Sequence, residues 1–261
     1  MKTAIFHSNL LHRAHPGDPA PAPRIPRNLS ATKGALSKAL QYVKLLKNGS
    51  FVGPFFRVRP SKKTPITFRE MTFMDKILLH SCCAPCSVYC VDTLRGEGIE
   101  PVSLWFNPNI HPWTEYDQRR STLLEYGEKE RVEVHILEDY GLRDFVRAVA
   151  ADIDHRCAHC YTIRLGTAAK YASEHGYEAF TSSLLISPYQ NHELLKAVGE
   201  TMARKYGVEF LYRDFRPGFR AGQAKAREMG LYLQKYCGCI FSEEDRYEKK
   251  IGRARTRFAE E

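Results

Sequence analysis

The sequence lacks the loops that most often hold nucleotide phosphates. Its 261 residues contain no Walker lysine motif and no Gly-x-Gly-x-x-Gly, so neither ATP nor a dinucleotide is expected to bind in these ways. It also has no apolar run long enough to span a bilayer and no convincing secretory signal. We therefore expect no membrane partner, and a protein that works in the cytoplasm, where cysteines stay reduced.

Acidic side chains are scarce in the first part of the chain. Residues 1–70 hold thirteen Lys and Arg, two Asp and Glu, and eight of the fourteen prolines. Their net charge is +11, and because the whole chain carries +9, the remainder carries −2. This composition predicts a basic, Pro-rich, disordered extension over residues 1–73 and a folded domain over residues 74–261. The extension is interpreted as dispensable, or as the product of a start assigned before Met71 or Met74; the alternative is an arm that contacts nucleic acid.

Apolar runs alternate with amphipathic segments in the rest of the chain. Because repeated strand–helix order is typical of parallel sheets, the predicted fold class is α/β, a Rossmann-like parallel sheet with helices on both faces. Thr114 is the expected N-cap of one helix, with Asp117 at the capping-box position. Strands are expected at 76–80, 101–106, 132–137, 178–182 and 208–212. Helices are expected at 88–97, 114–130, 142–150, around 161–172, and at 191–206.

Seven of the eight cysteines fall in three short motifs. The first motif directly follows the first strand, at the carboxyl edge where parallel sheets hold their ligands. The ATP-pyrophosphatase enzymes that thiolate tRNA would place a Ser-Gly-Gly-x-Asp-Ser loop there, so we expect a metal site at this edge instead of a phosphate site. Cys90 lies outside the motifs and is interpreted as a buried apolar residue. The motifs are Cys82-Cys83-x-x-Cys86, Cys157-x-x-Cys160 and Cys237-x-Cys239.

Clustered thiolates select either iron–sulfur clusters or zinc. Structural zinc sites usually combine two Cys-x-x-Cys pairs, or Cys with His, whereas the three motifs here differ in spacing, which favours iron–sulfur. A secreted disulfide framework fits poorly, because the chain is far longer than small disulfide scaffolds. The Cys157 and Cys160 pair lies near the N-terminus of a predicted helix, where the helix dipole favours thiolate over thiol.

Longer segments around the cysteines resemble one known family. The chain is similar to the QueH-type epoxyqueuosine reductases over roughly residues 75 to 246, and the similarity does not reach the first seventy residues. The matching segments are 80–86 (HSCCAPC), 106–112 (FNPNIHP) with Glu115 and Tyr116, 156–161 (RCAHCY) with Arg164 and Leu165, 181–192 (TSSLLISPYQNH) and 236–242 (YCGCIFS).

The resemblance implies a reaction and a set of cofactors. Enzymes of this type reduce the epoxide of epoxyqueuosine at the wobble position of tRNA, the last step of queuosine synthesis, without cobalamin or ATP. Protein side chains cannot supply low-potential electrons, so a cofactor is expected. The implied cluster is a [4Fe-4S] held by Cys82, Cys83, Cys157 and Cys160. The implied partners are tRNA carrying epoxyqueuosine in its anticodon loop and an electron donor that the sequence does not identify.

The roles of the remaining cysteines stay open. By resemblance, Cys237 and Cys239 form a redox-active pair, and the alternative is that both bind a second iron. Cys86 either binds a second, mononuclear iron or only lines the site. Two other functions compete with the reductase: a zinc-stapled RNA-binding module, and an iron–sulfur tRNA sulfur-transfer enzyme, which the missing pyrophosphatase loop disfavours. Candidate proton donors, with structural hydrogen bonding as the alternative, are His80, His111 and His192.

Basic groups and aromatic residues offer candidate contacts to tRNA. Tyr189 and Gln190 are candidates for contacting the modified base, and Trp105 or Trp113 for stacking on an unpaired base. Each basic group is interpreted as either a phosphate contact or a solvated face. The basic groups are Arg119 with Arg120, Arg213 with Arg216 and Arg220, and Lys249 with Lys250, Arg253 and Arg255.

Overall fold

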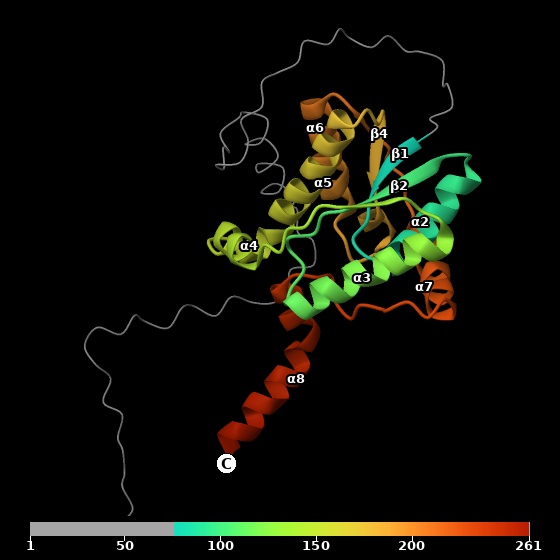
Figure 1. Ribbon diagram of the computed structural model, residues 1–261. Helices are drawn as coiled ribbons and strands as arrows, with labels where there is room; N and C mark the ends of the chain where they lie inside the picture. Colours follow the sequence, from blue (N-terminus) through green and yellow to red (C-terminus); the bar gives the residue numbers. More distant parts are fainter. Residues whose placement is uncertain (1–75, 261) are drawn as a thin grey trace, which may run out of the picture.

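The computed structural model describes residues 76–260 (Figure 1). The extension predicted for residues 1–73 lies outside the described residues and stays a prediction. No helix in the described part is both long and apolar enough to cross a bilayer.

A single five-stranded sheet forms the centre of the described chain. Its strand order is β3-β2-β1-β4-β5, and every neighbouring pair is parallel. This confirms the predicted α/β class with a Rossmann-like parallel sheet. The strands are β1 (Lys76–His80), β2 (Glu100–Trp105), β3 (Val134–Ile136), β4 (Ala179–Ser182) and β5 (Glu209–Phe210).

Helices cover both faces of the sheet, as the alternating order predicts. The helix α2 packs against α7 and α3 on one face, while α5 packs against α6, β1 and β4 on the other (Figure 1). The α-helices are α2 (Ala84–Gly96), α3 (Trp113–Glu130), α4 (Leu142–Val149), α5 (Arg156–Glu174), α6 (His192–Tyr206), α7 (Phe219–Glu228) and α8 (Ile240–Glu260). Short 3-10 turns are η1 (Ile153–His155), η2 (Ser183–Ile186) and η3 (Arg216–Gly218).

The core lies around the central strands. Ile77, Leu78 and Leu79 of β1 are completely buried, as are Leu104 and Trp105 of β2. Burial on both faces is expected for the middle of a parallel sheet, and it explains why these strands are nearly continuous apolar runs. This rigid centre fixes the position at which each loop leaves the sheet.

The structure corrects the predicted starts of two helices that flank the first two sheet loops. Thr114 is not the N-cap of α3, because the helix starts at Trp113, with Pro112 in the cap position and no side-chain cap. Asp117 accordingly pairs with Arg120 at 2.9 Å instead of closing a capping box. The first helix starts at Ala84, earlier than the predicted 88, because Pro85 suits the first turn of a helix.

The two last helices, α7 and α8, were not predicted. Most residues of α8 are charged and few are apolar. The helix therefore lacks the regular spacing of apolar residues that marks a core-facing helix. The helix α8 extends away from the sheet and its covering helices (Figure 1). The position of α8 therefore depends on the contacts that its first turn makes.

Candidate metal centre

The first cysteine motif lies where the direction of the sheet reverses. The strands β1 and β4 are neighbours, and the segments that follow them lead to helices on opposite faces. Ligands of open parallel sheets bind at such a switch point. Here the backbone N–H of Cys82, after β1, donates to Ser183 Oγ at 2.9 Å, and Ser183, after β4, donates to the Cys82 sulfur at 3.3 Å.

Three thiols are gathered at this point. The sulfurs of Cys82, Cys83 and Cys86 all lie within 4.8 Å of one another, and all three side chains are buried. Cys82 and Cys83 Sγ are 3.8 Å apart. Gln234, from the segment before the last cysteine motif, donates to Cys83 Sγ at 2.9 Å and to Cys86 Sγ at 3.4 Å. No local signal in the sequence marked Gln234.

The three thiols differ in acidity. Hydrogen bonds from Cys83 and Cys86 lower the pKa of Cys82 well below its usual value. Burial and the same contact with Cys82 raise the pKa of Cys83. One thiolate stabilised by two neighbouring thiols is a donor set that fits a thiophilic metal, because the thiolate is the form that binds metals.

The second motif begins α5, as the sequence predicts. Cys157 is in the first turn of this helix and is exposed, while Cys160, one turn later, is buried. Burial raises the pKa of Cys160 to about 12, against the opposing effect of the Arg164 charge. Among the described residues, only the first motif forms a compact group of metal-type ligands. The predicted quartet of Cys82, Cys83, Cys157 and Cys160 therefore stays a prediction.

The third motif is held in a tight loop before α8. Buried Arg119 donates to the carbonyl oxygens of Tyr236 at 3.0 Å and Cys237 at 2.8 Å, and its Nε donates to Glu115 at 2.7 Å. Gly238 has φ of +151°, and a Cβ there would lie 3.0 Å from Ile110 Cγ1. Both facts require glycine at this position. The residue Cys237 is exposed and Cys239 is buried.

Gln190 connects the third motif to the second. Its side-chain amide donates to Cys237 Sγ at 3.2 Å, while its oxygen accepts a hydrogen bond from Tyr161 at 2.7 Å. The neighbouring Tyr189 is 84% exposed. The amide of Gln190 thus lies beside the Cys237 thiol, and a contact of Tyr189 and Gln190 with the modified base stays a prediction.

One buried cation interacts with all three motifs. Arg164 is 1% exposed; its guanidinium donates to Cys160 Sγ at 3.6 Å and to Asn107 Oδ1 at 2.6 Å. Its charge also interacts with Cys82 and Cys237. Three cysteine motifs far apart in the sequence therefore share one guanidinium.

The candidate proton donors are engaged in structural hydrogen bonds. His80 is buried between Ser182 Oγ at 2.9 Å and the Phe106 carbonyl at 3.2 Å, and burial lowers its pKa to about 3. His111 lies 3.2 Å from the Pro108 carbonyl through Nε2, and burial lowers its pKa to about 4. His192 Nε2 lies 3.1 Å from the Ser187 carbonyl. His80 and His111 are neutral at pH 7, so neither is an imidazolium donor there.

The candidate tRNA contacts differ in their exposure and in their ion pairs. Trp105 is in the core, whereas Trp113 is 51% exposed and stacks on Tyr116. Arg119 is buried in the site. Arg120 forms ion pairs with Asp117 and Glu138. Arg213 pairs with Glu97, and Arg216 pairs with Asp214.

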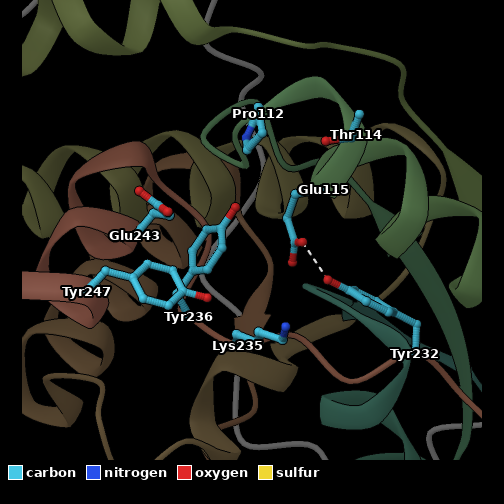
Figure 2. Close-up of a pocket in the computed structure, with 8 residues that line it drawn as sticks. All are labelled: Pro112, Thr114, Glu115, Tyr232, Lys235, Tyr236, Glu243 and Tyr247. Atoms are coloured by element: carbon cyan, nitrogen blue, oxygen red, sulfur yellow. Dashed lines mark hydrogen bonds between the residues drawn. The ribbon is translucent and has the colours of Figure 1, made fainter. Parts of the chain in front are cut away.

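A pocket of about 310 Å³ lies beside the third motif (Figure 2). Tyr232 donates to Glu115 at 2.6 Å across one side of it, and Glu243 and Tyr247 of α8 form another side. The remaining lining residues are Pro112, Thr114, Lys235 and Tyr236. The side chain of Gln234 contacts the thiols of the first motif, so the segment 234–237 contributes to both the thiol site and the pocket.

The fold and the site define a Rossmann-like α/β protein with a thiol-lined candidate metal centre at its switch point. A family model described as "Epoxyqueuosine reductase QueH" matches residues 77–245. The chain belongs to the epoxyqueuosine reductase QueH family, a family of oxidoreductases.

Curated relatives agree with the family model. An epoxyqueuosine reductase QueH from Dehalococcoides mccartyi is 37% identical over 174 residues, 67% of this chain and 96% of its own. One from Thermotoga maritima is 32% identical over 200 residues, 70% of this chain and 98% of its own. One from Haemophilus influenzae is 32% identical over 211 residues, 76% of this chain and 85% of its own.

A solved structure from Methanocaldococcus jannaschii, described as a subunit of tRNA methyltransferase, has a TM-score of 0.40 and 12% identity. The match covers 59% of this chain and 74% of that one, and nothing about function follows from it.

Proposed function

We propose that this protein reduces the epoxide of epoxyqueuosine at the wobble position of tRNA, which gives queuosine. The relatives are named for this activity. The observation that carries the proposal is the convergence of three cysteine motifs on Arg164 at the switch point of the sheet. Because the substrate is tRNA and the thiols are free, we place the protein in the cytoplasm.

The reaction consumes two electrons and two protons and releases the epoxide oxygen as water. A dithiol that closes to a disulfide delivers two electrons and two protons, so one oxidation of Cys237 and Cys239 balances one reduction of the epoxide. Cys237 is exposed at the surface, and its sulfur accepts a hydrogen bond from Gln190 at 3.2 Å, so an external reductant can approach this residue. That reductant reopens the disulfide by thiol exchange or electron transfer.

The proposed cofactor is a [4Fe-4S] cluster on Cys82, Cys83, Cys157 and Cys160. When bound, it supplies low-potential electron transfer and an iron that acts as a Lewis acid. Ser183 orients Cys82, and Gln234 orients Cys83 and Cys86.

The spacing of the first motif also supports a single-ion site. Thiolates around one tetrahedral ion with bonds of about 2.3 Å are roughly 3.8 Å apart, the distance between Cys82 and Cys83 Sγ. This supports one ion held by Cys82, Cys83 and Cys86 in place of the cluster, whereas a second iron on Cys86 beside the cluster is a separate proposal. It also keeps the zinc-stapled RNA-binding module as a second candidate, because zinc takes the same geometry.

Anaerobic purification and assay test the function directly. The reductase predicts a brown protein that contains iron and inorganic sulfide and converts epoxyqueuosine in tRNA to queuosine, measured by nucleoside mass spectrometry with a chemical reductant. A colourless protein with stoichiometric zinc and no conversion overturns the proposal in favour of the RNA-binding module. ATP consumption during turnover supports the sulfur-transfer alternative.

Single substitutions of cysteine by alanine assign the ligands. We expect Cys82, Cys83, Cys157 and Cys160 variants to lose iron and sulfide together, and Cys86→Ala to lose one iron while sulfide stays constant. Cys90→Ala is the matched control, because Cys90 is buried in the same helix, one turn after Cys86, and outside the ligand group. A ligand variant with full iron and sulfide removes that residue from the set.

Substitution by serine separates a relay from a ligand role for the third motif. If Cys237 and Cys239 relay electrons, either Ser variant retains the cluster spectrum and loses multiple turnover, and thiol trapping after one turnover finds the native pair oxidised. If both bind a second iron, the double variant lacks one iron while its sulfide content is unchanged.

A further inference from the structure

We propose that one face of α8 is the docking surface for the phosphate backbone of the substrate tRNA, a step that rests on the proposed function. The helix α8 begins at Ile240, directly after Cys239. RNA bound along this helix therefore lies next to the exposed Cys237 thiol. Four of the five arginines in the other two basic groups are ion-paired, namely Arg119, Arg120, Arg213 and Arg216 but not Arg220, so the group in α8 is the better candidate.

The later part of α8 carries a concentrated positive charge. Residues 246–257 contain six Lys and Arg and one Glu, a net charge of +5. Since residues 71–261 carry −2 in total, the remainder of that segment carries −7. Such asymmetry steers a polyanion to one part of a surface.

The helix places most of these charges on one side. At about 100° per residue, five basic side chains fall within about 100° of one another, and Arg255 points to the opposite side. These five residues, which we call the basic face, are Arg246, Lys249, Lys250, Arg253 and Arg257. Within residues 76–258, Arg246, Lys249, Arg253 and Arg257 form no ion pair, and Lys250 lies over the Tyr247 ring.

The dimensions of the basic face suit an RNA strand. It extends over about 17 Å at 1.5 Å per residue, and helix-borne Lys and Arg bind phosphates by releasing counterions. The charge of Asp245 in the first turns does not oppose this, because Asp245 pairs with Arg156.

The pocket beside the basic face favours RNA over other polyanions. Tyr247 belongs to both α8 and the pocket wall, and Tyr232 and Tyr236 supply two more aromatic rings (Figure 2). Unpaired bases stack on such rings. A phosphate strand on the basic face therefore runs beside a pocket with aromatic walls.

Two substitutions on opposite sides of α8 test the proposal in the full chain. Arg253→Glu and Arg255→Glu make the same change of charge at positions two residues apart. Both variant proteins include the N-terminal arm, so any binding by the arm is the same in the two. Binding of an unmodified tRNA transcript is measured by fluorescence anisotropy at several salt concentrations. We expect Arg253→Glu to weaken binding at least about fivefold and to reduce the salt slope by about 1, whereas Arg255→Glu changes Kd less than about twofold.

Turnover separates docking from a structural role. Arg253→Glu should raise KM for tRNA and leave kcat at saturating tRNA and the cluster spectrum unchanged. Equal weakening by both variants, or no weakening by either, overturns the docking surface. If the native protein binds tRNA through this face but does not convert epoxyqueuosine, the proposed function fails and the docking surface stands.

Discussion

Two arginines buried near the thiols have different partners. Arg119 is paired with Glu115 at 2.7 Å. Arg164 is equally buried, but its hydrogen-bond partners among the described residues are the uncharged Asn107 and the thiol of Cys160, and its Nε has none. A buried cation without an anion is costly. Arg164 therefore indicates that the thiols around it carry negative charge in the working protein, as thiolates of a metal centre do.

Replacing Arg164 tests this electrostatic role. Arg164→Gln removes a positive charge beside the centre, so adding an electron becomes less favourable and the reduction potential falls, by on the order of 100 mV. Arg164→Lys keeps the charge and should shift the potential less. Spectroscopic redox titration of the purified variants measures both. An unchanged potential in an Arg164→Gln protein with full iron content contradicts the role.

At the scale of elements, the loop between Gln234 and α8 determines how the third motif meets the other two. His111 donates its backbone N–H to the Gly238 carbonyl at 2.8 Å, and its Nδ1 accepts from the Ile240 N–H at 3.4 Å. The neutral ring thus satisfies an N–H at the start of α8. The same residue fixes both the Cys-Gly-Cys loop and the origin of the helix.

Substitution by alanine should be harmful at Gly238 and stabilising at Gly252. Gly238→Ala forces a side chain into an unfavourable φ and against Ile110, so the thiols of the pair shift and turnover falls about 100-fold. Gly252→Ala, in the middle of α8, meets nothing within 4 Å and should raise the free energy of unfolding by up to about 1 kcal/mol. Steady-state turnover and chemical denaturation are the measurements. Native activity of Gly238→Ala would show that the loop tolerates a shift.

The neutral state of His111 makes stability depend on pH. Burial lowers the pKa of His111 from 6.5 to about 4, so between these values the unfolded chain binds a proton that the folded chain does not. The contribution of the neutral His111 ring to the free energy of unfolding is complete above pH 6.5. It is lost on acidification, by at most about 1.4 kcal/mol per pH unit. Denaturation at pH 7 and pH 5 should show a smaller difference for His111→Phe than for the native protein. Equal differences would assign the pH dependence to other groups.

At the scale of the whole molecule, charge is divided among three parts. The first seventy residues carry +11, residues 246–257 of α8 carry +5, and the rest of the chain carries −7. The family match starts at residue 77 and ends at residue 245, so it covers the sheet and its loops and leaves out both basic parts.

A chain that starts at Met74 tests the predicted independence of the domain. It retains all described elements from β1 onward, so it should fold, keep its iron content and turn over epoxyqueuosine at the native kcat. Far-UV circular dichroism, iron analysis and the tRNA assay check these three outcomes. Loss of turnover with iron retained would give the arm a role in catalysis or tRNA binding.

Local patterns in the sequence were enough to predict the sheet and its ligand edge. Apolar runs and turn residues located all five strands, although β3 and β5 are shorter than predicted. They also placed the first motif after β1 and the second at the start of α5. Polar α7 and α8 escaped prediction because they lack the apolar period on which such predictions rest.

The sequence by itself determined the α/β class, the thiol-rich edge and the family, because strand order and motif spacing are properties of neighbouring residues. Only the tertiary structure decided which side chains meet. Gln234 bonds Cys83 across 151 positions, Arg119 bonds Cys237 across 118, and Arg164 bonds Asn107 across 57. Such contacts arise when the sheet brings distant loops to one edge, and no local periodicity encodes them.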